Sequence, residues 1–174
     1  MDAQTESAAA APMPAEPLVE HRWLQQLVGE WTSEARMTMS PEPAESCQGG
    51  ERVRSLGGLW ILAEGWGDMP GGGSATMLMT IGYDPAKRRF VGSWIGSMMT
   101  HLWLYDGELD ASGTTLTLHS EGPDMSPGAA PGKQARYKDV ITMQSADHRT
   151  LSSHYLGEDG RWQQFMTAHY RRIK

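Results

Sequence analysis

The fold class is decided by the pattern at residues 76–97, which read TMLMTIGYDPAKRRFVGSWIGS. Two runs alternate between large apolar side chains and small or polar ones, with the period of two that places neighbouring residues on opposite faces of a β-strand. Asp84-Pro85 stands between the runs, and this dipeptide is typical of a turn. The stretch therefore predicts two antiparallel strands, 76–83 and 89–97, joined as a hairpin.

The same pattern extends outward along most of the chain. Short runs rich in Thr, Val, Ile, Trp and Tyr alternate with turn residues such as Gly, Pro and Asp. An open sheet of such strands would leave two exposed edges, and closure into a barrel removes both. We therefore predict an all-β fold of about ten strands, an up-and-down antiparallel barrel, with a β-sandwich as the alternative. The predicted strands are 30–39, 46–56, 59–66, 76–83, 89–97, 100–108, 114–121, 134–145, 150–157 and 162–172.

One short helix is predicted ahead of the first strand. The apolar residues in this region approach the i, i+3, i+4 spacing of one helical face. Gly29 ends the pattern, as glycine often does at the end of a helix. The apolar residues are Leu18, Trp23, Leu24, Leu27 and Val28. Their spacing predicts about three turns of helix.

Residues 1–17 precede this helix and read MDAQTESAAAAPMPAEP. They lack both the basic segment and the continuous apolar segment of a secretory signal. Pro12, Pro14 and Pro17 disfavour a packed helix here. We therefore expect a disordered Ala/Pro-rich tail at 1–17 and a single β-barrel domain over 18–174.

The composition narrows the class of partner. The chain has 174 residues, a formal net charge of -6 and 39% hydrophobic residues, which is typical of one soluble domain. The acidic balance argues against a protein that binds a phosphate backbone, so no nucleic acid partner is expected. The charged content of 21% and the mean hydropathy of -0.48 predict no membrane span. The single cysteine, Cys47, excludes an intrachain disulfide and a multi-thiolate metal site. A reducing, cytoplasmic location is expected.

Several short motifs follow one another along the chain. They are the Gly-x-Trp at the end of Leu24–Trp31, Gly82-Tyr-Asp84, Phe90-Val-Gly-Ser-Trp94 and the final Tyr170-Arg171-Arg172. Together they resemble the bacterial lipocalin-like proteins catalogued as domain of unknown function 1579, over residues 18–174. The resemblance implies a calycin-like barrel in which Trp31 closes one end of the core, but it implies no reaction. Arg171 or Arg172 is the expected stacking partner of that indole.

Strand alternation also predicts which side chains face the interior. Residues two apart share a face, and we assign the apolar and aromatic face of each central strand to the inside. A barrel of this size can hold a small ligand. The assigned residues are Trp60, Leu62, Glu64 and Trp66; Met77, Met79, Ile81 and Tyr83; Phe90, Gly92, Trp94 and Gly96; and His101, Trp103 and Tyr105.

The predicted function is binding of a small, largely apolar or aromatic molecule inside the barrel. His101, Glu64 and Tyr155 are the polar side chains expected to orient it, because they can donate or accept hydrogen bonds. The predicted ligand-binding residues are His101, Trp94, Trp66, Trp103, Glu64, Met79 and Tyr155.

Catalytic residues cannot be assigned from the sequence. It contains no Gly-x-Ser-x-Gly elbow, and its histidines do not have the HxH or HxxxH spacing of a metal site. Two alternatives to the binding protein stay open. One is a haem-binding or other barrel enzyme that uses His101 or His169 as axial ligand or as general acid and base. The other is a packed structural homodimer without a ligand.

Overall fold

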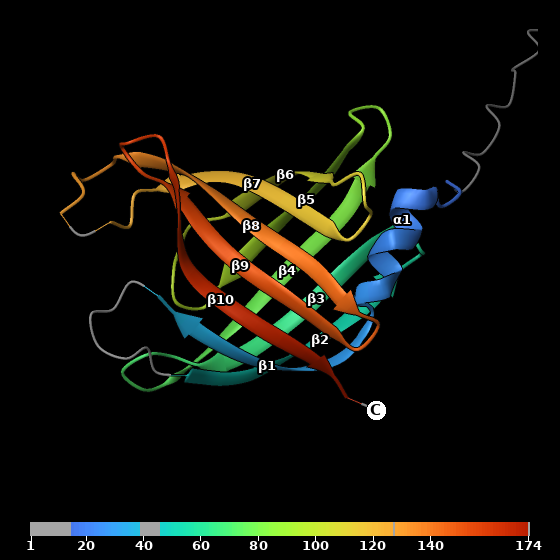
Figure 1. Cartoon of the computed structure of the whole chain (residues 1–174), viewed down its shortest axis with the longest axis horizontal. Helices are drawn as coiled ribbons and strands as arrows, with labels where there is room; N and C mark the ends of the chain where they lie inside the picture. The colour runs from blue at the N-terminus through green and yellow to red at the C-terminus, as the bar shows by residue number, and fades with distance from the viewer. Residues whose placement is uncertain (1–14, 39–45, 127, 174) are drawn as a thin grey trace, which may run out of the picture.

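Ten antiparallel strands form a closed barrel (Figure 1) in the computed structural model, which describes residues 15–38, 46–126 and 128–173. The strands follow one another around the barrel in chain order, and β1 pairs with β10 to close it. The predicted up-and-down barrel is confirmed, and the sandwich alternative is excluded. The strands are β1 (Gly29–Met37), β2 (Ser46–Leu56), β3 (Trp60–Asp68), β4 (Ser74–Asp84), β5 (Arg89–Gly96), β6 (Trp103–Leu109), β7 (Thr115–Pro123), β8 (Gln134–Ser145), β9 (His148–Leu156) and β10 (Trp162–Arg172).

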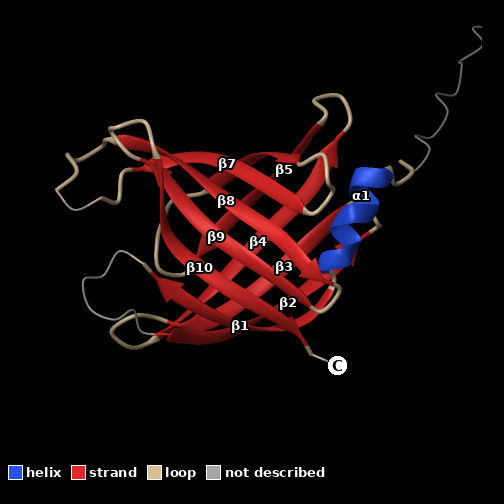
Figure 2. Ribbon diagram, viewed as in Figure 1, coloured by secondary structure: helices blue, strands red, loops and turns tan. Residues whose placement is uncertain are grey.

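The helix before β1 is shorter than predicted. It is α-helical over α1 (Val19–Leu24) and then tightens into the 3₁₀ turn η1 (Gln25–Leu27). The predicted apolar face is present, because Trp23, Leu24 and Leu27 are all buried. Figure 2 shows this helix lying against one end of the barrel. Of the predicted tail, residues 1–14 lie outside the described residues.

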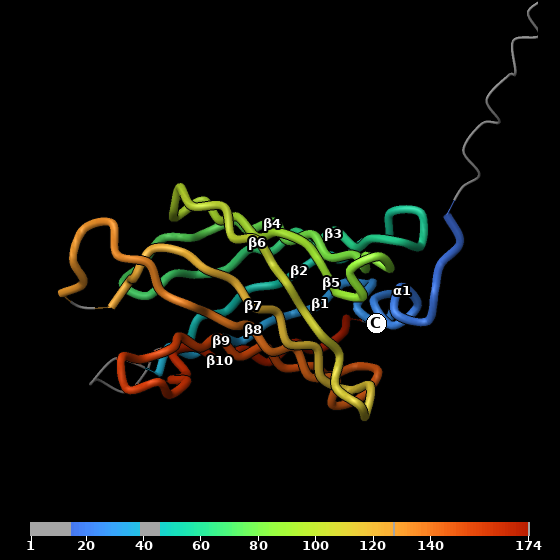
Figure 3. The backbone as a smooth tube through the Cα atoms, turned by 90° about the horizontal axis from the view of Figure 1, so that it is seen from above, coloured from blue at the N-terminus to red at the C-terminus, as the bar shows by residue number. Residues whose placement is uncertain are grey.

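The two ends of the barrel differ. We call the end covered by α1 the helix end, and it also carries the β2–β3, β4–β5, β6–β7 and β8–β9 connections. The opposite, loop end carries the β3–β4, β5–β6, β7–β8 and β9–β10 connections. Seen from above, the β7–β8 loop projects from one end while α1 lies at the other (Figure 3).

Hydrogen bonds attach the helix to the barrel. The backbone N–H of Leu18 donates to His21 Nδ1 over 3.0 Å, and Nε2 of the same ring donates to the Tyr83 carbonyl over 3.1 Å. The indole N–H of Trp23 donates to the Gly113 carbonyl over 2.7 Å. Because these contacts bury one face of α1 against the sheet, the helix closes this end of the interior.

The apolar core fills the helix end. The inward side chains there are at most 2% exposed, and they are Trp31, Ile61, Ile81, Phe90, Leu116 and Ile141. The Arg172 guanidinium lies 4.1 Å from the centre of the Trp31 ring. The predicted closure by Trp31 and its stacking with a C-terminal arginine are therefore confirmed.

Candidate functional site

The interior of the barrel changes from the helix end to the loop end. Inward side chains nearer the loop end keep accessible surface, in contrast to the fully buried ones at the helix end. The same faces of the same strands carry both groups, so the difference reflects the space inside the barrel. The partly accessible inward side chains of the loop-end half are Met77, Trp94, Tyr155 and Met166, and Leu151 and Tyr170, farther toward the helix end, also keep accessible surface. Solvent therefore reaches the loop-end half of the interior.

A carboxyl group lies between the two halves. Asp139 of β8 accepts a hydrogen bond from the Tyr105 hydroxyl over 2.5 Å and from the Ser153 hydroxyl over 2.6 Å. Asp139 and Ser153 are register partners, whereas Tyr105 reaches across from β6. Burial raises the pKa of Asp139 above its ordinary value, although both hydrogen bonds act in the opposite direction. Burial and the nearby carboxylate also raise the pKa of Tyr105.

A buried ion pair lies beside this carboxyl group. Arg149 of β9 pairs with Glu51 of β2, and the two residues are 1% and 8% exposed. The guanidinium lies between two rings, 4.8 Å from the centre of Trp31 and 4.2 Å from the centre of Tyr170. Its Nε–H has no partner among the described residues. A buried donor without a partner costs free energy, so this N–H is available to an acceptor that enters the barrel.

Tyr170 joins the two groups. Burial raises the pKa of its phenol, and the charges of Glu51 and Asp139 raise it further. Within the described part of the chain, no residue shares a hydrogen bond with its hydroxyl, yet Tyr170 keeps accessible surface. This hydroxyl can therefore bond to water or to a ligand. We call the six residues the interior polar cluster: Glu51, Tyr105, Asp139, Arg149, Ser153 and Tyr170.

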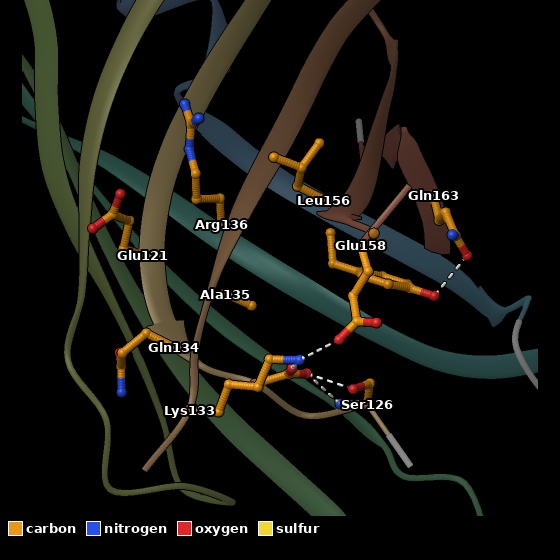
Figure 4. A pocket seen from close by; sticks show the side chains of 12 residues that line it. Glu121, Ser126, Lys133, Gln134, Ala135, Arg136, Leu156, Glu158 and Gln163 are labelled. Carbon is orange, nitrogen blue, oxygen red and sulfur yellow. Dashed lines mark hydrogen bonds and ion pairs between the residues drawn. The ribbon is translucent and has the colours of Figure 1, made fainter. Parts of the chain in front are cut away.

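A pocket of about 510 Å³ opens at the rim of the loop end (Figure 4). Lys133 of the β7–β8 loop forms ion pairs with Glu158 over 2.8 Å and with Asp124 over 3.1 Å, which ties this loop to the β9–β10 connection. Hydrogen bonds from Ser126, together with the contact with Lys133, lower the pKa of Asp124 to about 2. Tyr155 also lines this pocket, so the pocket adjoins the loop-end interior.

Within the described residues, no group of three or more His, Cys, Asp or Glu is placed to hold a metal ion. No helix of this part of the chain is long and apolar enough to cross a membrane.

The model of a family described as "Protein of unknown function (DUF1579)" matches residues 16–172. The chain belongs to this family. The resemblance stated from the sequence motifs is thereby confirmed. No curated protein matches the DUF1579 chain.

Solved structures share the fold of this DUF1579 chain at low sequence identity. Rv2717c from M. tuberculosis superposes with a TM-score of 0.62 at 11% identity, covering 91% of this chain and 100% of its own. The S-type phycobiliprotein lyase CPES from Guillardia theta superposes with a TM-score of 0.50 at 16% identity, covering 92% and 99%. The barrel EF1p2_mFAP2b, solved bound to DFHBI, has a TM-score of 0.48 at 16% identity, covering 88% and 99%.

Four of the seven predicted site residues of the DUF1579 chain, Met79, Trp94, Trp103 and Tyr155, are on inward strand positions. Met79 and Trp103 are buried at 8% and 7% exposure, whereas Trp94 is partly accessible. The Tyr155 hydroxyl donates to Gln163 Oε1 over 2.6 Å. His101 lies near the rim, where its Nε2 donates to the Glu121 carbonyl over 3.2 Å and its ring packs edge-on against Trp103.

The expected inward orientation of Trp66 and Glu64 is wrong. Trp66 is 48% exposed on the outer face of β3, and Glu64 is exposed on the same face, with Trp60 at 38%. Glycines on neighbouring strands explain this. A Cβ at Gly50 would lie 2.6 Å from the Trp66 ring, and one at Gly82 would lie 2.4 Å from the Trp60 ring. Each outer indole therefore covers the backbone of a glycine, while smaller side chains of β3 face inward.

The outer face of the barrel also holds His169, so the proposal that it ligates a haem inside the barrel is wrong. Its ring stacks on His148, with 3.1 Å between His148 Nε2 and His169 Nδ1. His119 and His154 likewise lie on outward positions, between buried inward residues of β7 and β9.

Sequence reasoning missed most of the interior polar cluster, because charged side chains are usually assigned to the solvent side. The alternation of side chains along β8 and β9 did indicate that two of these charged residues face inward. Asp139 stands two residues from both Tyr137 and Ile141, and Arg149 stands two residues from Leu151, so each shares a face with apolar neighbours.

Proposed function

We propose that this DUF1579 barrel binds a small, largely apolar or aromatic molecule in the loop-end half of its interior. The observation that carries the proposal is the Tyr170 hydroxyl, which lies among buried polar groups, keeps accessible surface and has no hydrogen-bond partner within the described part of the chain. The accessible side chains that line the space are mainly apolar or aromatic, and Trp94, Met77 and Met166 are examples. Apolar walls with a few placed polar groups are typical of ligand sites.

The charges of the interior polar cluster favour an uncharged ligand. Glu51 and Arg149 neutralise each other, and burial favours the protonated form of Asp139. An anionic ligand beside Tyr170 would lose its hydration without finding an unpaired positive charge, whereas a hydroxyl, amide or carbonyl group would bond without that cost. We therefore place such a polar group of the ligand at the Tyr170 hydroxyl.

The rim residues belong to the same proposal. His101, Trp103 and Tyr155 lie toward the loop end, where a ligand would enter. Glu64 and Trp66 are not part of this site because they lie on the outer face. A cytoplasmic location is proposed on the single cysteine of the sequence, Cys47.

Native mass spectrometry of the purified protein tests whether a ligand is retained. Binding is then measured with N-phenyl-1-naphthylamine, an uncharged fluorescent aromatic probe, and by its displacement with 1-naphthol or 1-naphthoate. We expect the probe to bind with quenching of tryptophan fluorescence and 1-naphthol to displace it more strongly than 1-naphthoate. If the probe does not bind and no ligand is retained, the proposal fails.

Tyr170→Phe locates the polar contact. Loss of one neutral hydrogen bond should weaken 1-naphthol by about 2-fold to 10-fold. Tyr83→Phe removes the same hydroxyl from a tyrosine near α1 and should leave the affinity unchanged. Equal affinities of the two variants would exclude Tyr170 as the anchor.

A further inference from the structure

One side of the barrel's outer surface is apolar. The outward side chains of β3 to β6 and of the β5–β6 loop include five large hydrophobic residues that are 38% to 63% exposed. By contrast, the outward positions of β8, β9, β10 and β1 carry polar or charged side chains such as Lys138, His154 and Arg171. The five residues, which we call the apolar face, are Trp60, Trp66, Ile95, Leu102 and Leu104.

Strand register makes this surface continuous. Leu78 of β4 lies opposite Glu64 of β3 on one side and Ile95 of β5 on the other. Ser93 of β5 lies opposite Leu104 of β6. The middle of the surface thus carries uncharged side chains on β4, β5 and β6, and Glu64 lies at its β3 side.

The exposed apolar area is large for a monomer. At about 150 to 250 Å² of surface for each large side chain, five that are about half exposed present roughly 500 Å². That value lies in the upper part of the range for the largest apolar patch on a typical monomer, about 300 to 600 Å². Together with its polar margin it approaches the roughly 800 Å² that each partner contributes to a standard protein interface.

We propose that the apolar face is the contact surface of a homodimer, with a second copy of this chain packed on it about a two-fold axis. In a two-fold contact each surface meets its own copy, so like charges at the centre would repel. The centre here, around the hydrogen-bonded pair Thr80 and Ser93, is uncharged. Outer faces of sheets can pack on one another at about 10 Å, and tryptophan is enriched in such interfaces.

A lipid surface fits the apolar face less well. Attachment to anionic membranes requires basic residues around the apolar area. The margin of this face instead carries the acidic side chains of Glu64, Asp106 and Glu108, of which the last two pair with Arg89. The net charge of -6 adds to the repulsion.

Sedimentation equilibrium of the full chain across the micromolar range tests the proposal. We expect a dimer, and we expect the double variant Ile95→Glu, Leu104→Glu to be a monomer with the same far-UV circular dichroism. Thr150→Glu, Thr167→Glu adds the same charges on the outward positions of β9 and β10 and should remain a dimer. A monomeric native chain, or a dimer that survives the first double variant, would overturn the proposal.

A milder variant and a vesicle-binding assay complete the test of the dimer proposal. If the double variant does not fold, the milder Leu104→Ser is used, and it should raise the dimer dissociation constant at least several-fold. Co-sedimentation with phosphatidylglycerol vesicles supplies the competing outcome: a monomeric native chain that binds these vesicles would assign the apolar face to lipid instead. Failure of the naphthylamine probe to bind would leave this proposal untouched, because the two surfaces lie on opposite sides of the barrel wall.

Discussion

The buried carboxyl group of Asp139 is stabilised by hydrogen bonds but destabilised by the loss of solvent. Two hydroxyl donors, from Tyr105 and Ser153, occupy its two oxygens. Burial nevertheless dominates and raises its pKa above the ordinary value of 3.8. The ionised form is therefore less favourable in the folded barrel than in the unfolded chain.

Replacement of Asp139 by Asn should change how stability depends on pH. A carboxyl group whose pKa is raised by folding costs no stability below its unfolded pKa, and its cost grows as the pH rises through the folded pKa. The native protein should therefore lose stability relative to Asp139→Asn as the pH rises from below 3.8 toward neutrality. Urea unfolding of both proteins over this range measures the difference. A difference that does not vary with pH would contradict the assignment.

The buried pair Glu51–Arg149 gives a second prediction. Arg149→Met should cost about 3 to 5 kcal/mol, because it leaves the Glu51 carboxylate buried and unpaired. The double variant Glu51→Gln, Arg149→Met should recover much of that loss. Arg36→Met, which breaks the exposed pair with Glu34, is the control and should cost less than about 1 kcal/mol. Denaturant unfolding gives all three values, and an undiminished loss in the double variant would count against the pairing.

Single residues also mark the limit of prediction from this sequence. Alternation states which residues share a face of a strand, but not which face is inside. In β4 and β5 one face of the strand is clearly more apolar than the other, and the predicted inward orientation of Met79 and Trp94 is correct. On β3 the face with the larger apolar residues points outward, because Gly50 and Gly82 of the neighbouring strands leave room for its two indoles there. Their positions follow from register, which the local pattern does not contain.

At the scale of elements, Arg172 connects the last strand to the end of the helix. Its guanidinium donates to the Val28 carbonyl over 2.6 Å, to the Gln26 carbonyl over 2.8 Å and to the Ala146 carbonyl over 3.1 Å. Carbonyl groups at a helix C-terminus lack partners within the helix. Arg172 therefore provides the hydrogen bonds that the short helix needs at the point where β1 and β10 meet.

Arg172→Ala should destabilise the barrel by about 2 kcal/mol or more, because several charge-assisted hydrogen bonds and the contact with Trp31 are lost together. Arg172→Lys keeps the charge but not the planar set of donors, so it should restore only part of the loss. Arg171→Ala, on an exposed position, should stay within about 0.5 kcal/mol of the native protein. Thermal unfolding compares the three, and equal effects at both arginines would refute this role.

Elements were predicted well where turns are marked by glycine, proline or aspartate, as between β4 and β5. The largest errors in the predicted boundaries lie at the start of β6 and at the end of the helix. β6 begins at Trp103 rather than near residue 100, because a turn holds the Met99 N–H on the Gly96 carbonyl. The helix is shorter because Val28 is extended, with ψ at 133°, and Gly29 has φ at 140°. Apolar spacing cannot distinguish an α-helix from a final 3₁₀ turn.

At the scale of the whole molecule, the filled helix end and the accessible loop end should differ in local stability. Amide hydrogen exchange measured by mass spectrometry on overlapping peptides tests this. Within β3 and β5, amides around Ile61 and Phe90 should exchange more slowly than those around Gly67 and Gly96, because fewer buried contacts hold the loop end. Uniform protection along these strands would contradict a graded interior.

Because β1 and β10 close the barrel, the barrel cannot be completed until β10 has been synthesised. The ribosome releases β1 early, but β10, the strand that covers its free edge, ends only at Arg172. At roughly 10 residues per second, the nascent chain waits on the order of 10 s with an unpaired edge and an unsealed interior. Chaperones that shield strand edges should therefore matter most during translation, and premature termination before β10 should yield aggregated product instead of a smaller folded domain.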